Sequence, residues 1–396
     1  MPNPVLKTHE EMRGMKKRAP VKRVEAFVEK IFEPDMHAKR VMSLARATAD
    51  AVQTASLAIH AIGRAMALAY GLDAKHAIKQ VDRLLSNDGI DPDVFFPSWV
   101  RSCIGPRKDI VVALDWTEFD RDDHSTIALH LVTSTGRALP LFWKTVVKSK
   151  LKGWRNEHED DLLLRFEAAL PDAVSVTLLA DRGFGDQKLY ELLSSLAFDY
   201  VIRFRGIIRV EQGAESKAAS DWVLPTGRAR VLRDARVTAD RYLVGSVVCV
   251  HDRKMKEPWF LATSFRDRPA NQIVKLYGRR FTIEESFRDI KDLRFGLGLS
   301  SVQIRSPERR DRMLLITAIA SVLLTLLGAA GESIGLDRRL KANTAKTRTH
   351  SLFFQGCHYY LAIPAMRPEL LDPLVLAFDK LLRSDPALAL VFEAGK

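Results

Sequence analysis

One short stretch in the C-terminal half of the chain combines a carboxylate with several cations and a phenol. It runs Tyr277-Gly-Arg-Arg-Phe-Thr-Ile-Glu-Glu-Ser-Phe-Arg-Asp-Ile-Lys291, and we call it the signature stretch. If it forms one helix, about 100° per residue places Tyr277, Arg280, Glu284, Arg288 and Lys291 within an arc of about 80°. A carboxylate among phosphate-binding groups suits metal-assisted phosphoryl chemistry on nucleic acid. The same spacing also fits a solvated face with i,i+4 ion pairs, so this stretch alone leaves both interpretations open.

Two further carboxylates end short apolar runs. Asp115 ends Ile110-Val-Val-Ala-Leu-Asp115, and Asp181 ends Val174-Ser-Val-Thr-Leu-Leu-Ala-Asp181. Such runs predict buried strands, and an acid at a strand end lies at the sheet edge, where sites form. Asp115, Asp181 and Glu284 are therefore the candidate catalytic and metal-binding residues. Three adjacent carboxylates repel one another, and a pair of divalent cations would offset that repulsion.

Other titratable residues lie close to these acids along the chain. Glu285 is rotated by about 100° from Glu284 on a helix, away from the basic face, so Glu284 is preferred. His124 and His130 are interpreted as ordinary strand or loop residues, because oxygen-rich surroundings suit hard cations that prefer oxygen ligands. The remaining nearby acids are predicted to be loop charges: Glu118, Asp120, Asp122, Asp123 and Asp186.

The signature stretch matches the pattern Y-x2-R-x3-E-x6-K and resembles that of bacterial cut-and-paste DDE insertion-sequence transposases. This is the family of the composite tetracycline- and kanamycin-resistance transposons. Asp115-Trp116-Thr117 resembles its first-acid motif, and Ala180-Asp-Arg-Gly-Phe184 resembles its second. The resemblance extends from about residue 75 to about residue 350 and includes four further stretches: Ile78–Asn87, Lys256–Ser264, Gly296–Leu299 and Arg305–Glu308.

The resemblance implies a metal-dependent DNA transposase, an endonuclease and strand transferase. Such an enzyme cuts an insertion sequence at its terminal inverted repeats and joins it to target DNA, here through a hairpin intermediate. Asp115, Asp181 and Glu284 would hold two Mg²⁺ ions per active site, with Mn²⁺ as a substitute. The alternative is a catalytically inactive DNA-binding protein of transposase descent.

The resemblance also implies DNA-binding residues and a partner subunit. Tyr277, Arg280, Arg288 and Lys291 would bind phosphates near the scissile bond. Trp259 would engage a base flipped out of the duplex, although a Trp in an apolar strand is as often an ordinary packed aromatic. A homodimer would form the synaptic complex and act in trans.

The predicted elements around the acids have the order of an α/β ribonuclease-H-like catalytic core. Strands are predicted at Ile110–Asp115, Ser125–Val132 and Ala138–Val146, with a turn at Thr133–Gly136 between the last two. Helices and strands then alternate: Asp160–Ala169, Val174–Asp181, Gln187–Ala197 and Tyr200–Phe204. An all-β insertion follows, and the helix that resumes near Asn271 is predicted to run through the signature stretch.

The domain organisation follows from this order. We predict an α-helical N-terminal DNA-binding domain at 1–108 and the first part of the core at 109–205. The β-rich insertion covers 206–264. The second part of the core, with the catalytic helix, covers 265–331, and a helical C-terminal region covers 332–396. In the N-terminal domain Ala45–Tyr70 and His76–Leu85 have helical patterning. A helical bundle that only packs on the core is the alternative to a DNA-reading domain.

Composition agrees with a nucleic-acid partner. The formal charge of +12 and the pI near 9.6 indicate a polyanion as partner. Cys103, Cys249 and Cys357 are too few and too far apart for a zinc site or a disulfide framework, which fits a reducing cytoplasm. The polar, basic N-terminus does not have the pattern of a signal peptide. We expect a cytoplasmic, nucleoid-associated bacterial protein.

One apolar stretch offers a competing interpretation. Met313–Gly331 contains no charged residue and is long enough to span a membrane. It follows the charged run Arg309–Arg312, and hydroxyl and small residues interrupt it. We therefore predict a buried core helix and no membrane partner, with a membrane-associated protein as the alternative.

Overall fold

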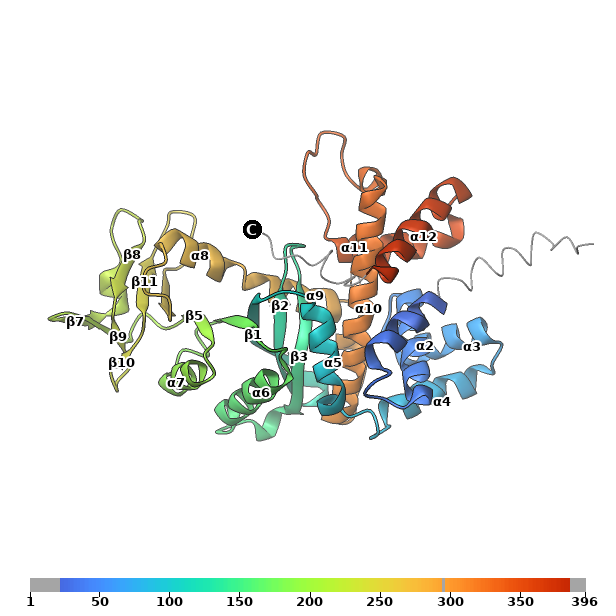
Figure 1. The fold of residues 1–396 in the computed structure, drawn as a ribbon, viewed down its shortest axis with the longest axis horizontal. Helices are drawn as coiled ribbons and strands as arrows, with labels where there is room; N and C mark the ends of the chain where they lie inside the picture. The colour runs from blue at the N-terminus through green and yellow to red at the C-terminus, as the bar shows by residue number, and fades with distance from the viewer. Residues whose placement is uncertain (1–21, 294–295, 385–396) are drawn as a thin grey trace, which may run out of the picture. The chain divides into compact units, whose positions relative to one another are not determined.

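The computed structural model of the chain describes residues 22–293 and 296–384. These residues form two compact units (Figure 1). The terminal unit joins the described residues up to Gly105 with those from Arg288 onward, and the central unit is Pro106–Phe287. The basic residues before position 22 and the end of the predicted C-terminal region, 385–396, lie outside the described residues.

The regular elements of the terminal unit, within its described residues, are helices. A helical stretch at residues 22–32 comes first. The helical patterning predicted over Ala45–Tyr70 is confirmed, but the stretch forms two helices, with Ala55 in a left-handed conformation (φ 45°) at the end of the first. The helices of this unit are α2 (Ala38–Thr54), α3 (Ile59–Tyr70), α4 (Ala74–Leu85), α5 (Pro92–Ile104), α10 (Pro307–Ser333), α11 (Leu352–Ala362) and α12 (Pro368–Arg383).

The apolar stretch Met313–Gly331 lies inside α10. Among the described residues α10 is the one helix long and apolar enough to cross a membrane, and 83% of its apolar window is buried in the structure. Its first turns are tied to the N-terminal helices. Arg309 pairs with Asp82 at 2.6 Å, and Arg312 donates hydrogen bonds to two carbonyl oxygens near the end of α4. The prediction of a buried helix is confirmed.

The central unit is built on a mixed eight-stranded sheet with the order β3-β2-β1-β4-β5-β12-β11-β8. Strand β4 is parallel to β1 and to β5, and the other neighbours are antiparallel. The strands are β1 (Asp109–Phe119), β2 (His124–Val132), β3 (Ala138–Val147), β4 (Ser175–Ala180), β5 (Asp199–Arg203), β8 (Arg230–Arg233), β11 (Ser246–Val250) and β12 (Trp259–Thr263). The predicted core strands therefore exist, with ends that differ by a few residues.

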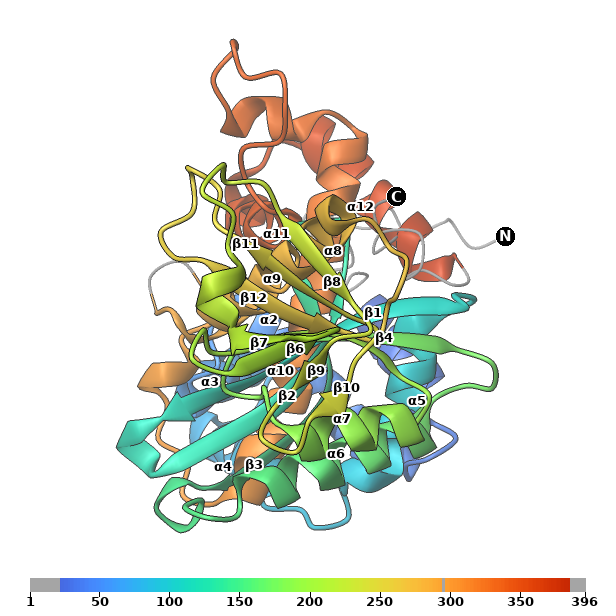
Figure 2. The same cartoon turned by 90° about the vertical axis from the view of Figure 1, so that its left-hand side faces the viewer.

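Helices cover both faces of this sheet. On one face α6 (Arg155–Ala169) packs on β2 and β3, and α7 (Gln187–Ser195) packs on β5. On the other face α8 (Ala270–Gly278) packs on β5 and β11 (Figure 2). Helix α9 (Phe281–Lys291) starts in the central unit and ends in the terminal unit.

Part of the predicted β insertion extends the core sheet. Strand β12 pairs with β5, and β11 and β8 follow it outward. The rest forms a separate small sheet with the order β10-β9-β6-β7. Its strands are β6 (Arg209–Gln212), β7 (Glu215–Ala218), β9 (Arg236–Val237) and β10 (Tyr242–Leu243). The pattern of the sequence predicts strands here, but not which sheet each one joins, because that depends on partners far along the chain.

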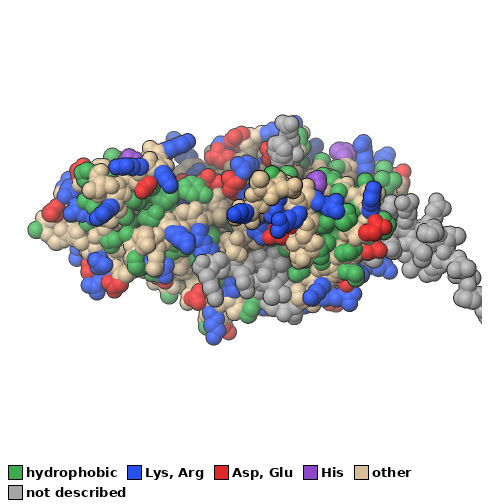
Figure 3. All heavy atoms as spheres, turned by 90° about the horizontal axis from the view of Figure 1, so that it is seen from above, with side chains coloured by type: hydrophobic (Ala, Val, Ile, Leu, Met, Phe, Trp, Pro, Cys, Tyr) green, Lys and Arg blue, Asp and Glu red, His purple; other side chains and the backbone are tan. Residues whose placement is uncertain are grey.

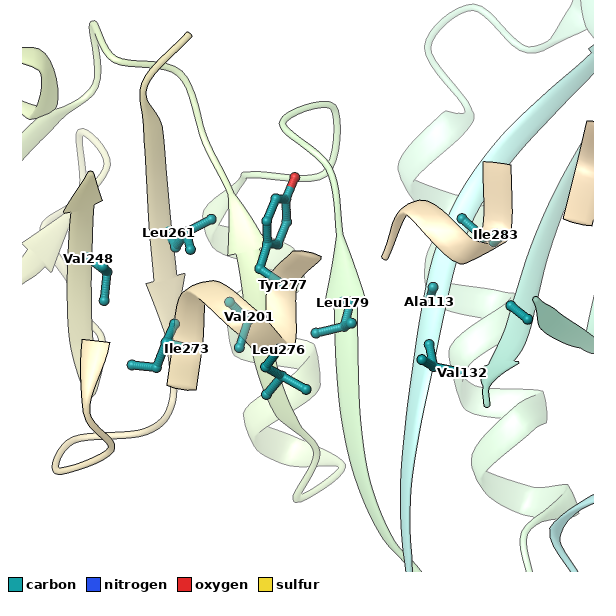
Figure 4. Packing of buried hydrophobic residues seen from close by; sticks show 11 residues of the cluster. Ala113, Val132, Leu179, Val201, Val248, Leu261, Ile273, Leu276, Tyr277 and Ile283 are labelled. Carbon is teal, nitrogen blue, oxygen red and sulfur yellow. The ribbon is translucent and has the colours of Figure 1, made fainter. Parts of the chain in front are cut away.

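An apolar core fixes α8 on the sheet. Ile273, Leu276 and Tyr277 of α8 pack against the sheet residues Val201 and Leu261 (Figure 4). Burial of each such aliphatic side chain contributes about 1.5–3 kcal/mol relative to exposure. The backbone that leads into the signature stretch is therefore held firmly against the strands.

The signature stretch is not one helix, and this part of the sequence-based prediction is wrong. Helix α8 ends at Gly278 and α9 begins at Phe281. Between them the amide of Arg280 bonds to the carbonyl of Tyr277 at 2.9 Å, three residues back. Such i→i+3 bonds wind the backbone more tightly than an α-helix does. The arc of an unbroken helix therefore does not apply across this turn, although Glu284, Arg288 and Lys291 share α9.

Candidate active site

Asp115 lies where the parallel pairing of β1 with β4 ends. The last parallel pair is Leu114 with Ala180, and β1 then continues to Phe119 paired only with β2. Asp115 is thus inside its strand and not at its end, which corrects the prediction. The cause is that the β1–β2 hairpin is longer than the parallel region. Asp181 directly follows β4, so the two carboxylates leave neighbouring strands at the same level.

Backbone amides orient both aspartates. The amide of Trp116 donates to Oδ1 of Asp115 at 2.9 Å, and the amide of Gly183 donates to Oδ1 of Asp181 at 2.8 Å. A Cβ atom at position 183 would lie 3.0 Å from that same oxygen. Glycine therefore leaves room for the carboxylate of Asp181 in this turn.

Glu284 reaches the site from the first turn of α9. A helix N-terminus favours a negative charge, so the position suits a carboxylate. Arg280, in the turn before α9, bridges two of the acids. Its Nη1 donates to Oδ2 of Asp115 at 3.2 Å, and its Nη2 donates to Oε1 of Glu284. The side chain of Arg280 is 6% exposed, that of Asp115 20% and that of Glu284 51%.

The three predicted acids interact electrostatically. Burial raises the pKa of Asp115 to about 6; Arg280 opposes this shift, and the negative charges of Asp181 and Glu284 add to it. The structure therefore brings together three acids that are far apart in the sequence. A buried carboxylate beside two others is the situation that a divalent cation relieves.

The carboxylate oxygens of the three acids suit a hard divalent cation, but in this structure they are not arranged as the ligands of a metal ion. Within residues 22–293 and 296–384, no three His, Cys, Asp or Glu side chains are grouped closely enough to hold a metal ion. Asp115 and Glu284 face the guanidinium of Arg280 instead. Carboxylate oxygens are the ligands that Mg²⁺ and Mn²⁺ prefer, so the three acids could bind such ions once they exchange these contacts.

Tyr277 is the buried phenol of the site, with 1% of its surface exposed. Burial raises its pKa; Arg280 and Arg203 oppose that shift, and Asp181 adds to it. Tyr277 and Arg280 thus lie in the same surroundings as the acids, and the sequence analysis predicted all of them as residues of one site. Arg288 and Lys291 lie in the part of α9 that belongs to the terminal unit, so their DNA-binding role stays a prediction.

Arg203 is a cation near the site that the sequence analysis missed. It is the last residue of β5, and its side chain is 13% exposed. Its Nη2 donates to the carbonyl of Pro258 at 3.1 Å and pairs with Glu257 at 3.1 Å. Glu257 also pairs with Arg182, the residue after Asp181, at 3.4 Å. The only signal in the sequence is an arginine that closes an apolar run, which is too common to single out.

Trp259 begins β12 and is partly buried. Its ring meets that of Tyr277 nearly edge to face at 4.9 Å and lies 5.9 Å from the ring of Phe281. Phe281 is 40% exposed. Trp259 thus packs in the structure and also belongs to an aromatic cluster that reaches the surface beside the turn of Arg280.

The acids next to the three candidates have partners elsewhere. Lys148 pairs with Glu118 at 2.6 Å and with Asp120 at 2.5 Å. Glu118 lies within β1, which corrects its prediction as a loop residue. Asp186 accepts a bond from the amide of Leu189 and caps α7. Glu285 pairs with Arg137 at 3.5 Å.

The two histidines near the first acid are both buried. Burial lowers the pKa of His130 to about 3, and its ring packs against Phe287 at 4.8 Å. A neutral, packed imidazole agrees with the interpretation of His130 as an ordinary strand residue. The three cysteines are free thiols.

A mixed α/β sheet with carboxylates on neighbouring parallel strands and on a nearby helix is typical of metal-dependent phosphoryl transferases that act on nucleic acids. Lys and Arg side chains are spread over the face seen in Figure 3, which suits a polyanion. The family model described as "Transposase DDE domain" matches residues 106–323, more than half of the chain. The chain belongs to the DDE transposase family. No curated protein matches it.

Membership of this family indicates the general function and agrees with the fold. The chain is a DNA transposase, and the family uses divalent metal ions in a nuclease and strand-transfer reaction. The eight-stranded mixed sheet with helices on both faces is consistent with a ribonuclease-H-like DDE domain.

Proposed function

We propose that this transposase works by cut and paste: it cuts an insertion sequence at its terminal inverted repeats and joins it to target DNA. One observation carries the proposal. Asp115 interacts electrostatically with both Asp181 and Glu284, and Arg280 and Tyr277 lie in the same surroundings. The resemblance to cut-and-paste transposases assigns these five residues, along with Arg288, Lys291 and Trp259, to catalysis or DNA binding.

In this proposal the three acids hold two Mg²⁺ ions, with Mn²⁺ as a substitute. When bound, such ions activate a water or a terminal 3′-hydroxyl and stabilise the leaving 3′-oxygen. The protein itself supplies alignment. The amides of Trp116 and Gly183 already orient the two aspartates, which reduces the cost of arranging them for each reaction.

Arg280 has two roles in succession. In the metal-free protein it neutralises Asp115 and Glu284. Once cations neutralise these carboxylates, its guanidinium can bind a DNA phosphate through two parallel hydrogen bonds. Tyr277 adds a hydroxyl donor to the same phosphate region, and Arg288 and Lys291 add positive charge further along α9.

A hairpin at the transposon end requires a tightly bent strand. Extruding one base relieves that bend, and stacking on an indole stabilises the extruded base by about 1–3 kcal/mol. Trp259 takes this role in our proposal. Its support is the position of its ring beside Tyr277 and the exposed Phe281.

We further propose a homodimeric synaptic complex that acts in trans in the bacterial cytoplasm, associated with the nucleoid. The N-terminal residues 1–108 would read the terminal repeat. The net charge of +12 supports contact with DNA over a large surface.

The test is incubation of the full-length protein with a duplex that contains the terminal repeat bordering its gene and the adjoining flank. Products are resolved on a denaturing gel with Mg²⁺, Mn²⁺, Ca²⁺ or EDTA. We expect cleavage and a hairpin product with Mg²⁺ or Mn²⁺, and binding with little cleavage in Ca²⁺, whose larger radius suits a tight octahedral site poorly. Full cleavage in EDTA would refute the metal-dependent site.

Single substitutions test the catalytic role of each acid. Asp115→Asn, Asp181→Asn and Glu284→Gln should each abolish cleavage and preserve DNA binding, because each removes a ligand charge with little change in size. Glu285→Gln is the matched control, since Glu285 pairs with Arg137 outside the site, and it should retain cleavage. A wild-type rate in any of the three variants would remove that residue from the site. Binding without cleavage in every metal would favour the inactive, DNA-binding alternative.

A further inference from the structure

A basic, aromatic segment lies directly before α6 and has no part in the site described so far. It runs Lys150-Leu-Lys-Gly-Trp-Arg155, and Lys150, Lys152, Trp154 and Arg155 are all exposed. Trp154 is 56% exposed and is the only tryptophan in the exposed class among the described residues. A large aromatic left in water between cations suits a ligand with flat rings and negative charge, which is the chemistry of unstacked nucleic acid.

The segment is anchored next to the first catalytic acid. The guanidinium of Arg155 lies over the ring of Trp116, 4.9 Å from its centroid. Nε1 of Trp116 donates to Oε1 of Glu159 at 2.7 Å, and Glu159 is 3% exposed. Trp116 directly follows Asp115 in β1. Through these contacts Arg155 and the start of α6 are held at the position of β1 that carries Asp115.

This segment and the turn that carries Arg280 lie on opposite faces of the sheet. Successive residues of a strand point to opposite faces. Asp115 meets Arg280 in the turn between α8 and α9, whereas Trp116 meets Glu159 of α6. Figure 2 shows α8 on one side of the sheet and α6 on the other. The segment nevertheless follows the end of β3, and His124 pairs both with Val147 at that end and with Phe119 at the end of β1. The segment therefore leaves the sheet at the edge toward which β1 runs from Asp115, and DNA that crosses this edge beside the acids can reach it.

We infer that Lys150, Lys152 and Trp154 form a second DNA-contact surface, for the host DNA that flanks the transposon before excision. The inference rests on the proposed function, in which Trp259 engages an extruded base of the transposon end, on one side of the scissile phosphate. The duplex on the other side of that phosphate is the flank. The lysines neutralise its phosphates, and Trp154 stacks on a base that unstacks near the cut.

The backbone supports this arrangement. Leu151 is 5% exposed and fixes the segment from beneath. Gly153 adopts a left-handed φ of 84°, a conformation that favours glycine. The glycine at position 153 therefore suits the turn before Trp154, and the backbone on both sides of that turn is held in place by Leu151 and by the start of α6.

The experiment compares two duplexes in Ca²⁺, at several salt concentrations, with the full-length protein. One duplex carries the terminal repeat with its flank, and the other ends at the cleavage position. Trp154→Ala should weaken binding of the flanked duplex by roughly 5- to 100-fold. Lys152→Ala should lower its log–log salt slope by about one unit. Neither should change binding of the duplex without a flank.

Matched variants separate a contact from a loss of folding. Trp154→Phe and Lys152→Arg should retain the binding of the flanked duplex, because they keep the ring and the charge. Lys108→Ala removes another exposed lysine, just before the opposite end of β1, and should have no effect. All these variants should melt at the wild-type temperature, since the side chains are exposed.

The other outcomes are equally decisive. Equal weakening on both duplexes, or no weakening on either, would overturn the inference and leave the proposed function intact. If the variants slowed only the joining of pre-cut ends to a target plasmid, the surface would bind target DNA and the assignment to the flank would be wrong. Wild-type protein that bound neither duplex would refute the proposed function, and this inference with it.

Discussion

Arg280 should stabilise the metal-free protein through the two carboxylates that it bridges. Its guanidinium is almost fully buried and donates to Asp115 and Glu284. Arg280→Met keeps most of the side-chain stem and removes the charge. Removal of one partner from a fully buried pair costs about 3–5 kcal/mol, whereas an exposed pair contributes about 0–1 kcal/mol. Because Glu284 is half exposed, we expect a loss of about 2–3 kcal/mol.

The loss of stability in Arg280→Met should depend on pH and on divalent metal ions. Arg280 opposes the raised pKa of Asp115, so without it the pKa of Asp115 in the folded protein rises further above its ordinary value. A carboxyl group with a raised folded pKa costs stability as pH rises through that value. The variant should therefore lose more stability at pH 8 than at pH 5. Mg²⁺ should restore part of it, because a bound cation neutralises the same carboxylates.

Thermal melting of the wild type and of Arg280→Met at pH 5 and pH 8, in EDTA and in Mg²⁺, measures this loss of stability directly. A loss of 2–3 kcal/mol corresponds to a decrease in Tm on the order of 5–10 °C for a domain of this size. Arg137→Met is the matched control, since Arg137 pairs with Glu285, and it should shift Tm by less and respond to Mg²⁺ as the wild type does. If Arg280→Met melted like the control under all four conditions, Arg280 would not be the counter-ion of the acids.

Three more predictions follow from the structure. Asp50 is 0% exposed, and its burial together with the charge of Glu25 raises its pKa to about 7, against the effect of Arg46. The free energy of unfolding should therefore fall by up to roughly 4 kcal/mol as the pH rises from 4 to 8. Melting curves of Asp50→Asn should not show this pH dependence. If stability depended on pH in Asp50→Asn as it does in the wild type, Asp50 would not be the cause of this dependence. Trp259→Ala should slow hairpin formation and opening more than the first nick in step-resolved kinetics; equal slowing of all steps with a large loss of Tm would show a packing role only. Lys291→Ala should make the salt dependence of end binding shallower by about one log–log unit, and a wild-type slope would argue against a phosphate contact.

Local patterns in the sequence determine which segments form strands and which side chains could do chemistry. Runs such as Ile110–Leu114 and Val176–Ala180 become buried strands wherever the chain places them, because their apolar side chains lose contact with water there. Asp115 and Asp181 are recognisable because each borders such an apolar run, and Glu284 because it shares a short stretch with Arg280, Arg288 and Lys291. A residue such as Arg203, which acts through neighbours distant in sequence, leaves no comparable local signal.

Tertiary contacts decide the rest. The position of Asp115 inside β1 depends on how far β1 pairs with β2, and the extension of the core sheet depends on the pairing of β12 with β5. The break between α8 and α9 lets Tyr277 pack on the sheet while Arg280 reaches Asp115 and Glu284. The sequence by itself determined the strands and the acidic residues, because burial and charge are properties of short segments. Only the folded chain determined that a buried arginine joins two of those acids, because the pair of Arg280 with Asp115 spans residues far apart along the chain.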